Sequence, residues 1–323
     1  MKLTLFLLAL TALAAVAATE EQLNKRFTVQ PEGKLVVDVD FGSIDVTTNG
    51  TGEVIVDVWR RITRRNKADE EKFLQDHPVT FSQDDNTVTV HCRRKGVGGW
   101  SWSGQSRQEA KYSITVPADF NAQLKTSGGS IAVSDLAGEV KANTSGGGLR
   151  FARLRGPLDG DTSGGGIHMT DCEGKLKIHT SGGGIDVRGG SGSLDGHTSG
   201  GSVTVKAFKG DAHIGTSGGG VTIEDVIGQV EGSTSGGSVS AVLPSPLPGD
   251  VKLSTSAGGV TVVVPADAAF ELDASTSAGR VSSDLPVTVV GKLERDRLKG
   301  TVNGGGKCVV LRSSAGSVHL KKP

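Results

Sequence analysis

The stretch Thr180-Ser181-Gly182-Gly183-Gly184-Ile185-Asp186-Val187 is one copy of a motif that recurs at a constant interval. The tetrapeptide Thr-Ser-Gly-Gly begins every 18 residues, at Thr126, Thr144, Thr162, Thr180, Thr198, Thr216 and Thr234. Related tetrapeptides begin at Thr255 and Thr276, and Ser313 begins the copy that closes the series. A fixed period over such a length is typical of repeat architectures, in which each unit stacks on the next.

Within each unit, apolar residues alternate with polar ones, which is the side-chain period of a β-strand. After Thr180, Ile185 and Val187 form one short strand, Gly192 marks a corner, and Leu194 begins a second strand. One such unit cannot bury its own apolar face, but a stack of units encloses a continuous core. The sequence therefore predicts an all-β fold, a parallel β-solenoid of about 18 residues per coil. Threonine is expected to point inward at the corner, and serine outward.

The chain divides into three predicted regions. Residues 1–18 have the pattern of a signal peptide, because Lys2 precedes an apolar run that ends in small residues just before Thr19. An uncleaved anchor is the alternative, but the apolar run is short for a membrane span. Residues 19–125 lack the repeat and are predicted to form an N-terminal β-rich cap, with one helix over 67–76. Residues 126–323 form the repeat domain.

Composition and motifs exclude several functional classes. The 35 Lys and Arg residues balance the 35 Asp and Glu residues, which argues against nucleic-acid binding driven by counterion release. No phosphate-binding loop, serine-hydrolase elbow or His-Glu-x-x-His motif is present in the sequence. The corners also lack the carboxylates of calcium-binding solenoids. We therefore expect a protein that is not an enzyme and has no cofactor.

Two surface features of the cap are candidate binding residues. Trp100 and Trp102 lie in a glycine- and serine-rich loop, and exposed tryptophans stack on sugars or anchor protein partners. In the competing interpretation, one tryptophan folds back onto the cap. Arg93 and Arg94 belong to a basic cluster, and a second cluster extends from Arg60 through Lys67.

Asp161, His179 and His197 occupy the same outward position on successive predicted coils, a spacing compatible with a transition metal. Solvent-exposed polar positions are the favoured interpretation, so no metal site is predicted.

The three cysteines are too few, and odd in number, for a disulfide framework. Cys92, Cys172 and Cys308 each continue an apolar pattern and are interpreted as small buried hydrophobic residues. A bridge between Cys92 and Cys308 is the alternative.

Four features together resemble a known bacterial family. They are the export signal, the opening segment Val39-Asp40-Phe41-Gly42-Ser43-Ile44-Asp45-Val46, the Thr-Ser-Gly-Gly-Gly-Ile repeats, and the closing segment Leu298-Lys299-Gly300-Thr301-Val302-Asn303-Gly304-Gly305-Gly306. The family is that of "putative adhesin" β-strand-repeat proteins, a domain of unknown function, and the resemblance extends from about Phe27 to Leu320. It implies the fold and supplies no catalytic residues.

The expected function is that of an exported, non-enzymatic, adhesin-like binding protein of the cell envelope or surface. Its location is the periplasm, the cell surface or the extracellular space, with no membrane span after cleavage of the signal. The expected partner is an envelope protein or a glycan, not a nucleic acid. The alternatives are a carbohydrate-active β-helix enzyme and a purely structural envelope scaffold.

Overall fold

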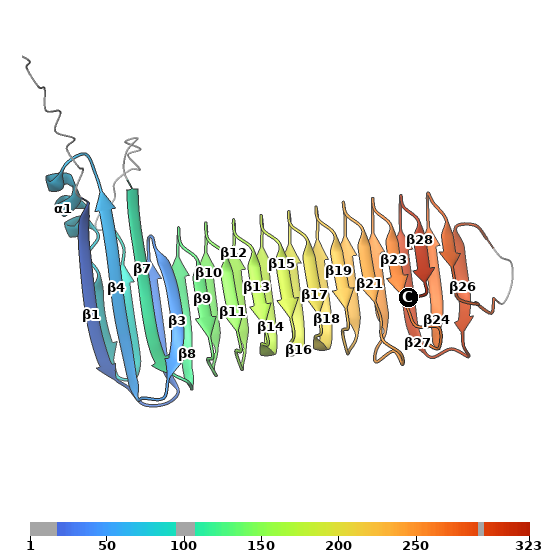
Figure 1. Cartoon of the computed structure of the whole chain (residues 1–323), viewed down its shortest axis with the longest axis horizontal. Coiled ribbons are helices and arrows are strands. Elements are labelled where there is room, and N and C mark those ends of the chain that lie inside the picture. The colour runs from blue at the N-terminus through green and yellow to red at the C-terminus, as the bar shows by residue number, and fades with distance from the viewer. Residues whose placement is uncertain (1–17, 95–106, 290–293) are drawn as a thin grey trace, which may run out of the picture.

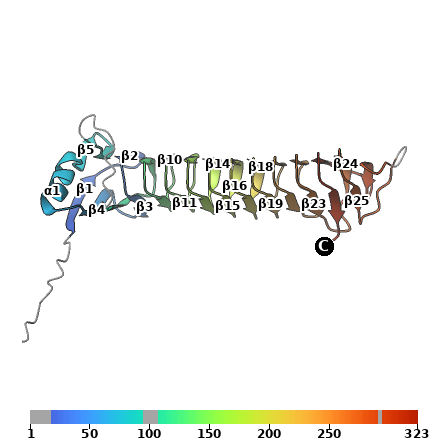
Figure 2. The same ribbon diagram turned by 90° about the horizontal axis from the view of Figure 1, so that it is seen from above.

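The chain forms a long rod built from two β-sheets packed face to face (Figures 1 and 2). The computed structural model describes residues 18–94, 107–289 and 294–323. In these residues each sheet has 14 strands, and most neighbouring strands are parallel. The all-β solenoid that the sequence predicts is confirmed.

The first sheet, sheet A, begins at the N-terminal end of the rod. Its strands follow in the spatial order β1 (Thr19–Thr28), β4 (Glu53–Thr63), β7 (Arg107–Pro117), β3 (Ser43–Asn49), β9 (Ile131–Ser134), β11 (Leu149–Ala152), β13 (Ile167–Thr170), β15 (Ile185–Arg188), β17 (Val203–Lys206), β19 (Val221–Glu224), β21 (Val239–Val242), β23 (Val260–Val263), β28 (Val318–Lys321) and β25 (Val281–Ser283).

The opposite sheet, sheet B, begins at the same end of the rod. Its strands follow in the order β5 (Thr80–Asp84), β6 (Thr87–Cys92), β2 (Gly33–Val39), β8 (Phe120–Thr126), β10 (Val140–Thr144), β12 (Leu158–Thr162), β14 (Glu173–Thr180), β16 (Ser191–Thr198), β18 (Lys209–Thr216), β20 (Val230–Thr234), β22 (Val251–Thr255), β27 (Lys307–Ser313), β24 (Phe270–Thr276) and β26 (Arg297–Val302).

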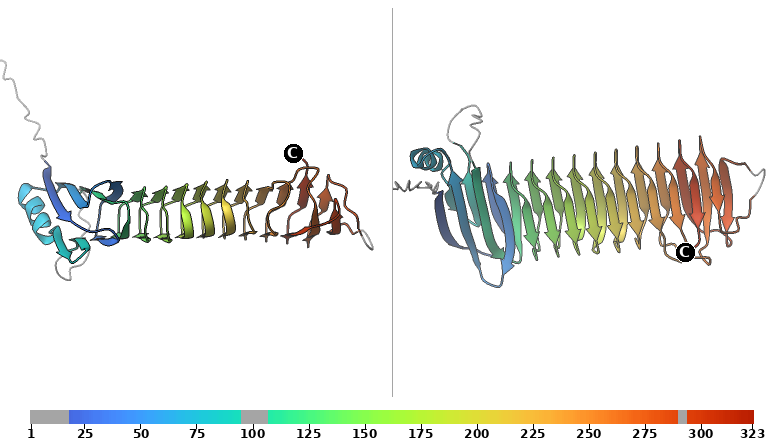
Figure 3. Two further views of the ribbon diagram at one scale, coloured as in Figure 1. Left: turned by 90° about the horizontal axis from the view of Figure 1, so that it is seen from below. Right: turned by 45° about the horizontal axis from the view of Figure 1, so that its top comes forward.

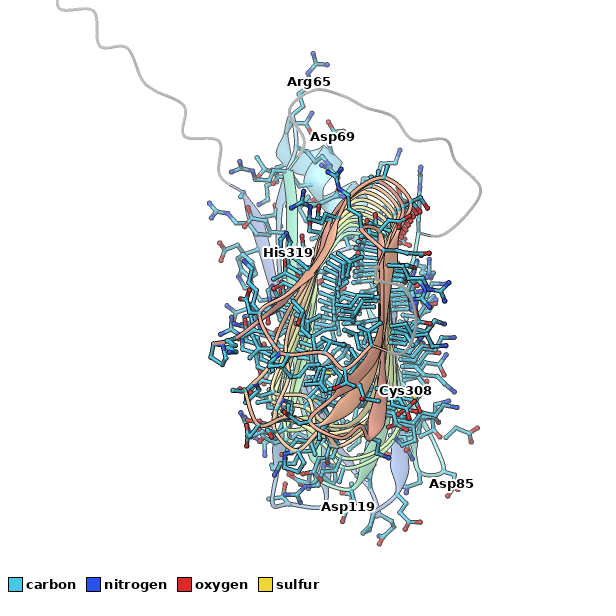
Figure 4. The ribbon with its side chains drawn as sticks, turned by 90° about the vertical axis from the view of Figure 1, so that its right-hand side faces the viewer. Arg65, Asp69, Asp85, Asp119, Cys308 and His319 are labelled. Atoms are coloured by element: carbon cyan, nitrogen blue, oxygen red, sulfur yellow. The ribbon has the colours of Figure 1, made fainter. Side chains whose placement is uncertain are left out.

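The repeats stack in the register that the sequence predicts. Ile185 of β15 aligns with Ile167 on one side and Val203 on the other, each 18 residues away. All three side chains are buried, as are the matching residues of sheet B, so the core runs continuously between the sheets (Figure 4). The parallel stacking satisfies the backbone groups of each coil with those of the next.

The threonines of the repeat connect adjacent coils. Thr180 is fully buried, and its Oγ1 donates a 2.7 Å hydrogen bond to the carbonyl oxygen of Gly165 in the preceding coil. The same hydroxyl accepts a bond from the backbone N–H of Gly183 at 3.3 Å. Equivalent bonds to a neighbouring coil recur at every threonine of the series, so an inward threonine is confirmed.

The two glycines of Thr-Ser-Gly-Gly differ in how much space they have. A Cβ on the second glycine, Gly147, would lie 2.2 Å from the carbonyl oxygen of Gly129, so only glycine fits. A Cβ on the first glycine, Gly146, would lie no closer than 3.5 Å to a neighbouring atom. The degenerate copies agree with this, because they keep the second glycine and replace the first with Ala257, Ala278 and Ala315.

Coil order at the two ends of the rod differs from chain order. The coil of β27 and β28 is last in the chain, yet it lies between the coil of β22 and β23 and the coil of β24 and β25. Ser313 therefore lies between Thr255 and Thr276. The copy that closes the series in the sequence does not close the stack of coils. At the other end, the first coil, β2 and β3, lies between β6–β7 and β8–β9. The outermost coils are β6–β7 and β24–β25, and these border the antiparallel strands β4, β5 and β26.

The N-terminal end is closed by antiparallel strands and by the one helix of the described residues, α1 (Lys67–Asp76), with the predicted bounds (Figure 3). Asn66 caps the helix, since its side-chain oxygen accepts a 2.9 Å bond from Asp69 N. Phe73 packs against Phe41 with ring centroids 5.7 Å apart. The helix thus covers apolar surface that the N-terminal end of the rod would otherwise expose.

Two expectations about the cysteines fail. Cys92 and Cys172 are buried as predicted, but Cys308 is exposed, because Val309 and Leu311 of β27 occupy the core positions and turn Cys308 outward (Figure 4). The alternative Cys92–Cys308 bridge is also wrong. Both thiols are free, and β6 and β27 lie near opposite ends of sheet B.

Candidate functional site

The tryptophans that the sequence favoured lie outside the described residues. Trp100 and Trp102 both belong to the segment 95–106, so their role as binding residues stays a prediction.

Arg93, the predicted basic binding residue, is held by carboxylates of its own chain. Its Nε donates a 2.8 Å bond to Asp38, a second bond links its Nη2 to the same carboxylate, and its Nη1 lies 3.1 Å from Asp40. The Arg93 guanidinium lowers the pKa of Asp38, and Asp38 in turn raises the pKa of Arg93. Arg94 also contributes to this network, because its backbone N–H donates to Asp40 at 2.7 Å. The Arg93 charge therefore serves to join β2 to the end of β6.

The second basic cluster is not a uniform surface patch. Arg60 is 1% exposed, points into the core, and donates a 2.7 Å bond from Nε to Glu21 and a 2.6 Å bond from Nη1 to the His77 carbonyl. Arg64 lies over the Phe73 ring, 4.3 Å from its centroid. These residues fasten α1 to β1 and β4.

Asp161, His179 and His197 do stack on adjacent strands, as their spacing predicts. No group of three potential ligands within the described residues is close enough together to hold a metal ion. His197 instead lies 2.9 Å from Asp195 through Nδ1, and its ring centroid is 5.0 Å from that of His213.

Two adjoining hollows mark the outer face of sheet A at the N-terminal end. The first has a volume of about 410 Å³ and lies over β1, β4 and β7. Its lining residues are Gln22, Leu23, Asn24, Asp57, Val58, Trp59, Lys111 and Ser113. The second, of about 420 Å³, continues over β7, β3, β9 and β11 and shares Asp57, Lys111 and Ser113 with the first. Together they form one surface, which we call the N-terminal groove.

Trp59 reaches this groove because of the pleat of β4. Val54, Val56 and Val58 fill the core, so the alternate residues Asp57 and Trp59 face outward. The strand register places Trp59 between Gln22 of β1 and Lys111 of β7. The indole is half-buried, which leaves part of it available for contact.

Hydrogen-bonding groups surround the indole on both sides. Lys111 Nζ lies 3.1 Å from Asp45 Oδ2, and the Asn24 amide donates to Asp57 Oδ1. Ser113 and Thr115 add hydroxyls along β7, and Arg150 lines the far end over β11. An aromatic platform with fixed polar groups around it is an arrangement that binds polar ligands with an apolar face.

Trp59 is a site residue that the sequence motifs did not single out, although its orientation is encoded locally. The alternation of Val54-Ile55-Val56-Asp57-Val58-Trp59 places the indole on the face opposite the valines. Its neighbours come from β1 and β7, which are far apart in the chain. Only strand pairing brings them together.

A family model described as Toastrack DUF4097 matches residues 34–321. The chain belongs to the Toastrack family. The resemblance that the sequence motifs indicated is thereby confirmed, for a β-solenoid family of unknown function. No curated protein matches the sequence.

Several solved structures resemble the Toastrack chain over nearly its whole length. A "putative adhesin" from Bacteroides fragilis is 11% identical, with a TM-score of 0.34, and covers 94% of this chain and 97% of its own. A "putative adhesin" from Parabacteroides merdae is 12% identical, with a TM-score of 0.35, and covers 93% and 96%. A "putative cell adhesion protein" from Clostridium sporogenes is 12% identical, with a TM-score of 0.21, and covers 94% and 100%. In the described part of the Toastrack chain, no helix is long and apolar enough to cross a membrane.

Proposed function

We propose that this Toastrack protein is an exported, non-enzymatic binding protein of the cell envelope or surface that holds a glycan in the N-terminal groove. The observation that carries the proposal is the half-buried Trp59 indole, flanked by Gln22 and Lys111 on one continuous sheet face. The rest of the rod serves as a rigid spacer that presents this face to its ligand.

The chemistry of the groove favours a sugar chain. The apolar face of a pyranose ring stacks on an indole, while its hydroxyls need donors and acceptors around the rim. Asp45, Asp57 and Lys111 supply both kinds of group, and Ser113 adds a hydroxyl. Each hollow falls within the size range of small-ligand sites, so the groove has room for several sugar units.

The arrangement supports binding rather than catalysis. Both carboxylates that line the groove are already engaged, Asp45 by Lys111 and Asp57 by Asn24. A glycosidase needs two carboxyl groups that act on one bond as acid and base or nucleophile. The groove offers the ligand a platform and fixed hydrogen-bonding groups, and no free acid–base pair.

The test is a binding screen of the exported protein against glycan arrays, peptidoglycan fragments and envelope proteins. Trp59→Ala should weaken glycan binding about five- to a hundredfold, because a stacking anchor contributes roughly 1–3 kcal/mol. Trp59→Phe should retain part of the affinity, and Thr222→Ala, on the outer face of a distant coil, should retain all of it.

Other outcomes would redirect the proposal. Unchanged affinity in a folded Trp59→Ala variant would exclude the N-terminal groove. A Trp100→Ala, Trp102→Ala double variant tests the site that the sequence favoured, and a loss of binding there alone would move the contact surface to that segment. Turnover of a polysaccharide by the wild type would overturn the non-enzymatic assignment.

A further inference from the structure

Glu70 of α1 is a buried carboxylate without an ion-pair partner among the described residues. Its exposure is 1%, and the donors that reach it are neutral. Thr19 N donates to Oε2 at 3.1 Å, Thr19 Oγ1 donates to the same oxygen at 2.6 Å, and Arg64 N donates to Oε1 at 3.0 Å. These hydrogen bonds lower the pKa of Glu70, so the group is held as an anion.

The cations around Glu70 in the described part of the chain are bonded to other groups. The Arg64 guanidinium attracts the Glu70 carboxylate from a distance, but it lies over the Phe73 ring and donates to Gln108 at 2.7 Å. Arg60, on the adjacent strand β4, is bound to Glu21 of β1. Glu70 is therefore hydrogen-bonded only by neutral donors among the described residues, with no cation in direct contact.

A cation in direct contact with Glu70 can come from a donor that is already present. Thr19 is the first residue after the small residues Ala17-Ala18 that end the predicted export signal. Its backbone nitrogen, an amide in the uncut chain, lies 3.1 Å from Glu70 Oε2. Cutting the chain immediately before Thr19 would convert this amide into an α-ammonium group without moving it.

We propose that a signal peptidase hydrolyses the Ala18–Thr19 peptide bond and that the new α-ammonium group of Thr19 forms a buried ion pair with Glu70. Water supplies the hydroxyl group to the Ala18 carbonyl carbon and a proton to the Thr19 nitrogen, and the resulting amine takes a second proton from solvent. No electron transfer is involved. Glu70 is thus the internal receptor for the mature N-terminus.

The pair has a structural consequence for the cap. Strand β1 forms the outer edge of sheet A, and its start is fastened to α1 through Thr19 and Glu70. The processed chain therefore gains an ion pair at the edge of the sheet that the unprocessed chain lacks. Since β1 also supplies Gln22 and Asn24 to the N-terminal groove, removal of the signal would stabilise one wall of that groove.

The cleavage position is tested by exporting the full chain from a Gram-negative host and determining the N-terminus by Edman sequencing and intact mass. The expected mature chain begins at Thr19. A chain that begins at another residue, or one that is not cut, overturns the proposal.

The ion pair is tested by the reactivity of the α-amine. We compare the chain that begins at Thr19 with a chain that keeps Ala18 as its first residue, using an amine-acylating reagent at pH 7.5. A partner anion raises the pKa of the α-amine above its ordinary value of about 7.7, and a rise of one unit lowers the unprotonated, reactive fraction at pH 7.5 about six- to sevenfold. The chain that begins at Thr19 should therefore react several-fold more slowly.

Glu70→Gln should remove this protection, whereas Glu71→Gln, on the exposed side of the same helix, should leave it intact. The stabilisation from the pair should be fully present below about pH 7.7 and be lost as the pH rises through the raised pKa of the amine. If Glu70→Gln does not fold, melting curves of the two wild-type chains from pH 6 to pH 10 decide the matter. Equal acylation rates, or melting temperatures that differ equally at all pH values, would contradict the ion pair.

Discussion

The repeat coils and the N-terminal end solve the same packing problem with different chemistry. In the repeats, the buried polar side chains of the described residues are threonines and Ser313, each bonded to the backbone of a neighbouring coil. At the N-terminal end, Arg60 and Glu70 are buried, and the Tyr112 hydroxyl is buried beside the Cys92 thiol. Burial raises the pKa of that tyrosine. Repetition thus produces a uniform, neutral interior, and charged groups enter where the repetition stops.

The outer surfaces differ in the same way. Each repeat contributes one four-residue strand to sheet A, and two of its residues face outward, so the face is a regular array of short strands. Strands β1, β4 and β7 have 10 or 11 residues. The first hollow of the N-terminal groove lies over them, and the second extends from β7 across β3 to the first repeat strands, β9 and β11. The comparison indicates that the repeats supply stiffness, whereas the irregular end supplies a binding surface.

The largest effect is expected from a charge placed in the repeat core. Ile185→Asp should unfold the rod, because an unpaired buried carboxylate costs several kcal/mol. Lys177→Ala, on the exposed face of β14, should cost well under ~1 kcal/mol. Thermal melts followed by circular dichroism measure both, and equal melting temperatures would contradict the inward and outward assignment.

Removing a buried charge from the cap should come next. Arg60→Ala leaves Glu21 and the His77 carbonyl without their partner, a loss of about 3 kcal/mol. Amide hydrogen exchange should show faster exchange in α1 and β1, with the repeats unchanged. Uniform loss of protection along the whole rod would show that cap and repeats are energetically one unit.

The two adjacent glycines of one repeat provide the sharpest matched pair. Gly147→Ala forces a Cβ to within 2.2 Å of the Gly129 carbonyl and should cost about 2 kcal/mol through overpacking. Gly146→Ala has 3.5 Å of clearance and should change stability by less than about 0.5 kcal/mol. Urea unfolding curves would measure both, and similar midpoints would mean that the coils can separate locally to admit a methyl group.

Removal of one threonine hydroxyl should have a smaller effect. Thr180→Val keeps the shape of the side chain but leaves the Gly165 carbonyl and Gly183 N–H without this partner, at a cost of about 1 kcal/mol. Ser181→Ala, which is exposed, is the control. Unchanged stability in the Thr180→Val variant would show that the buried threonines contribute by packing and not by hydrogen bonding.

The smallest expected effect is a pH dependence confined to the cap. The Arg93 guanidinium lowers the pKa of Asp38, so this pair stabilises the folded state above the ordinary carboxyl pKa of about 3.9. The stabilisation is lost as the pH falls through the lowered pKa. The difference in melting temperature between wild type and Asp38→Asn should therefore be full above about pH 5 and shrink towards pH 2. A difference that does not change with pH would exclude this ion pair as its source.

The candidate site could be predicted from the sequence only in part. The sequence predicts a binding surface at Arg93 and at the Arg60 cluster, because several basic residues lie close together in the chain. It gives no sign of the partners Asp38, Asp40 and Glu21, which distant strands supply. It does not mark Trp59, because an indole on the outer face of a strand is ordinary until its neighbours are known. The sequence pattern predicts the pleat of a strand, and the pairing of distant strands makes the site.

The sequence by itself determined the β-solenoid, its 18-residue register, the inward threonines and the bounds of the one helix in the described part of the chain. These follow from local alternation and from corners repeated at a constant interval, which every unit satisfies in the same way. The tertiary structure decided the order of the end coils, the exposure of Cys308 and the position of the N-terminal groove. The coils at Thr255, Thr276 and Ser313 carry equivalent patterns, so any of them could stack on any other. The antiparallel strands and the loops between coils select the order, and those interactions are not encoded in the period.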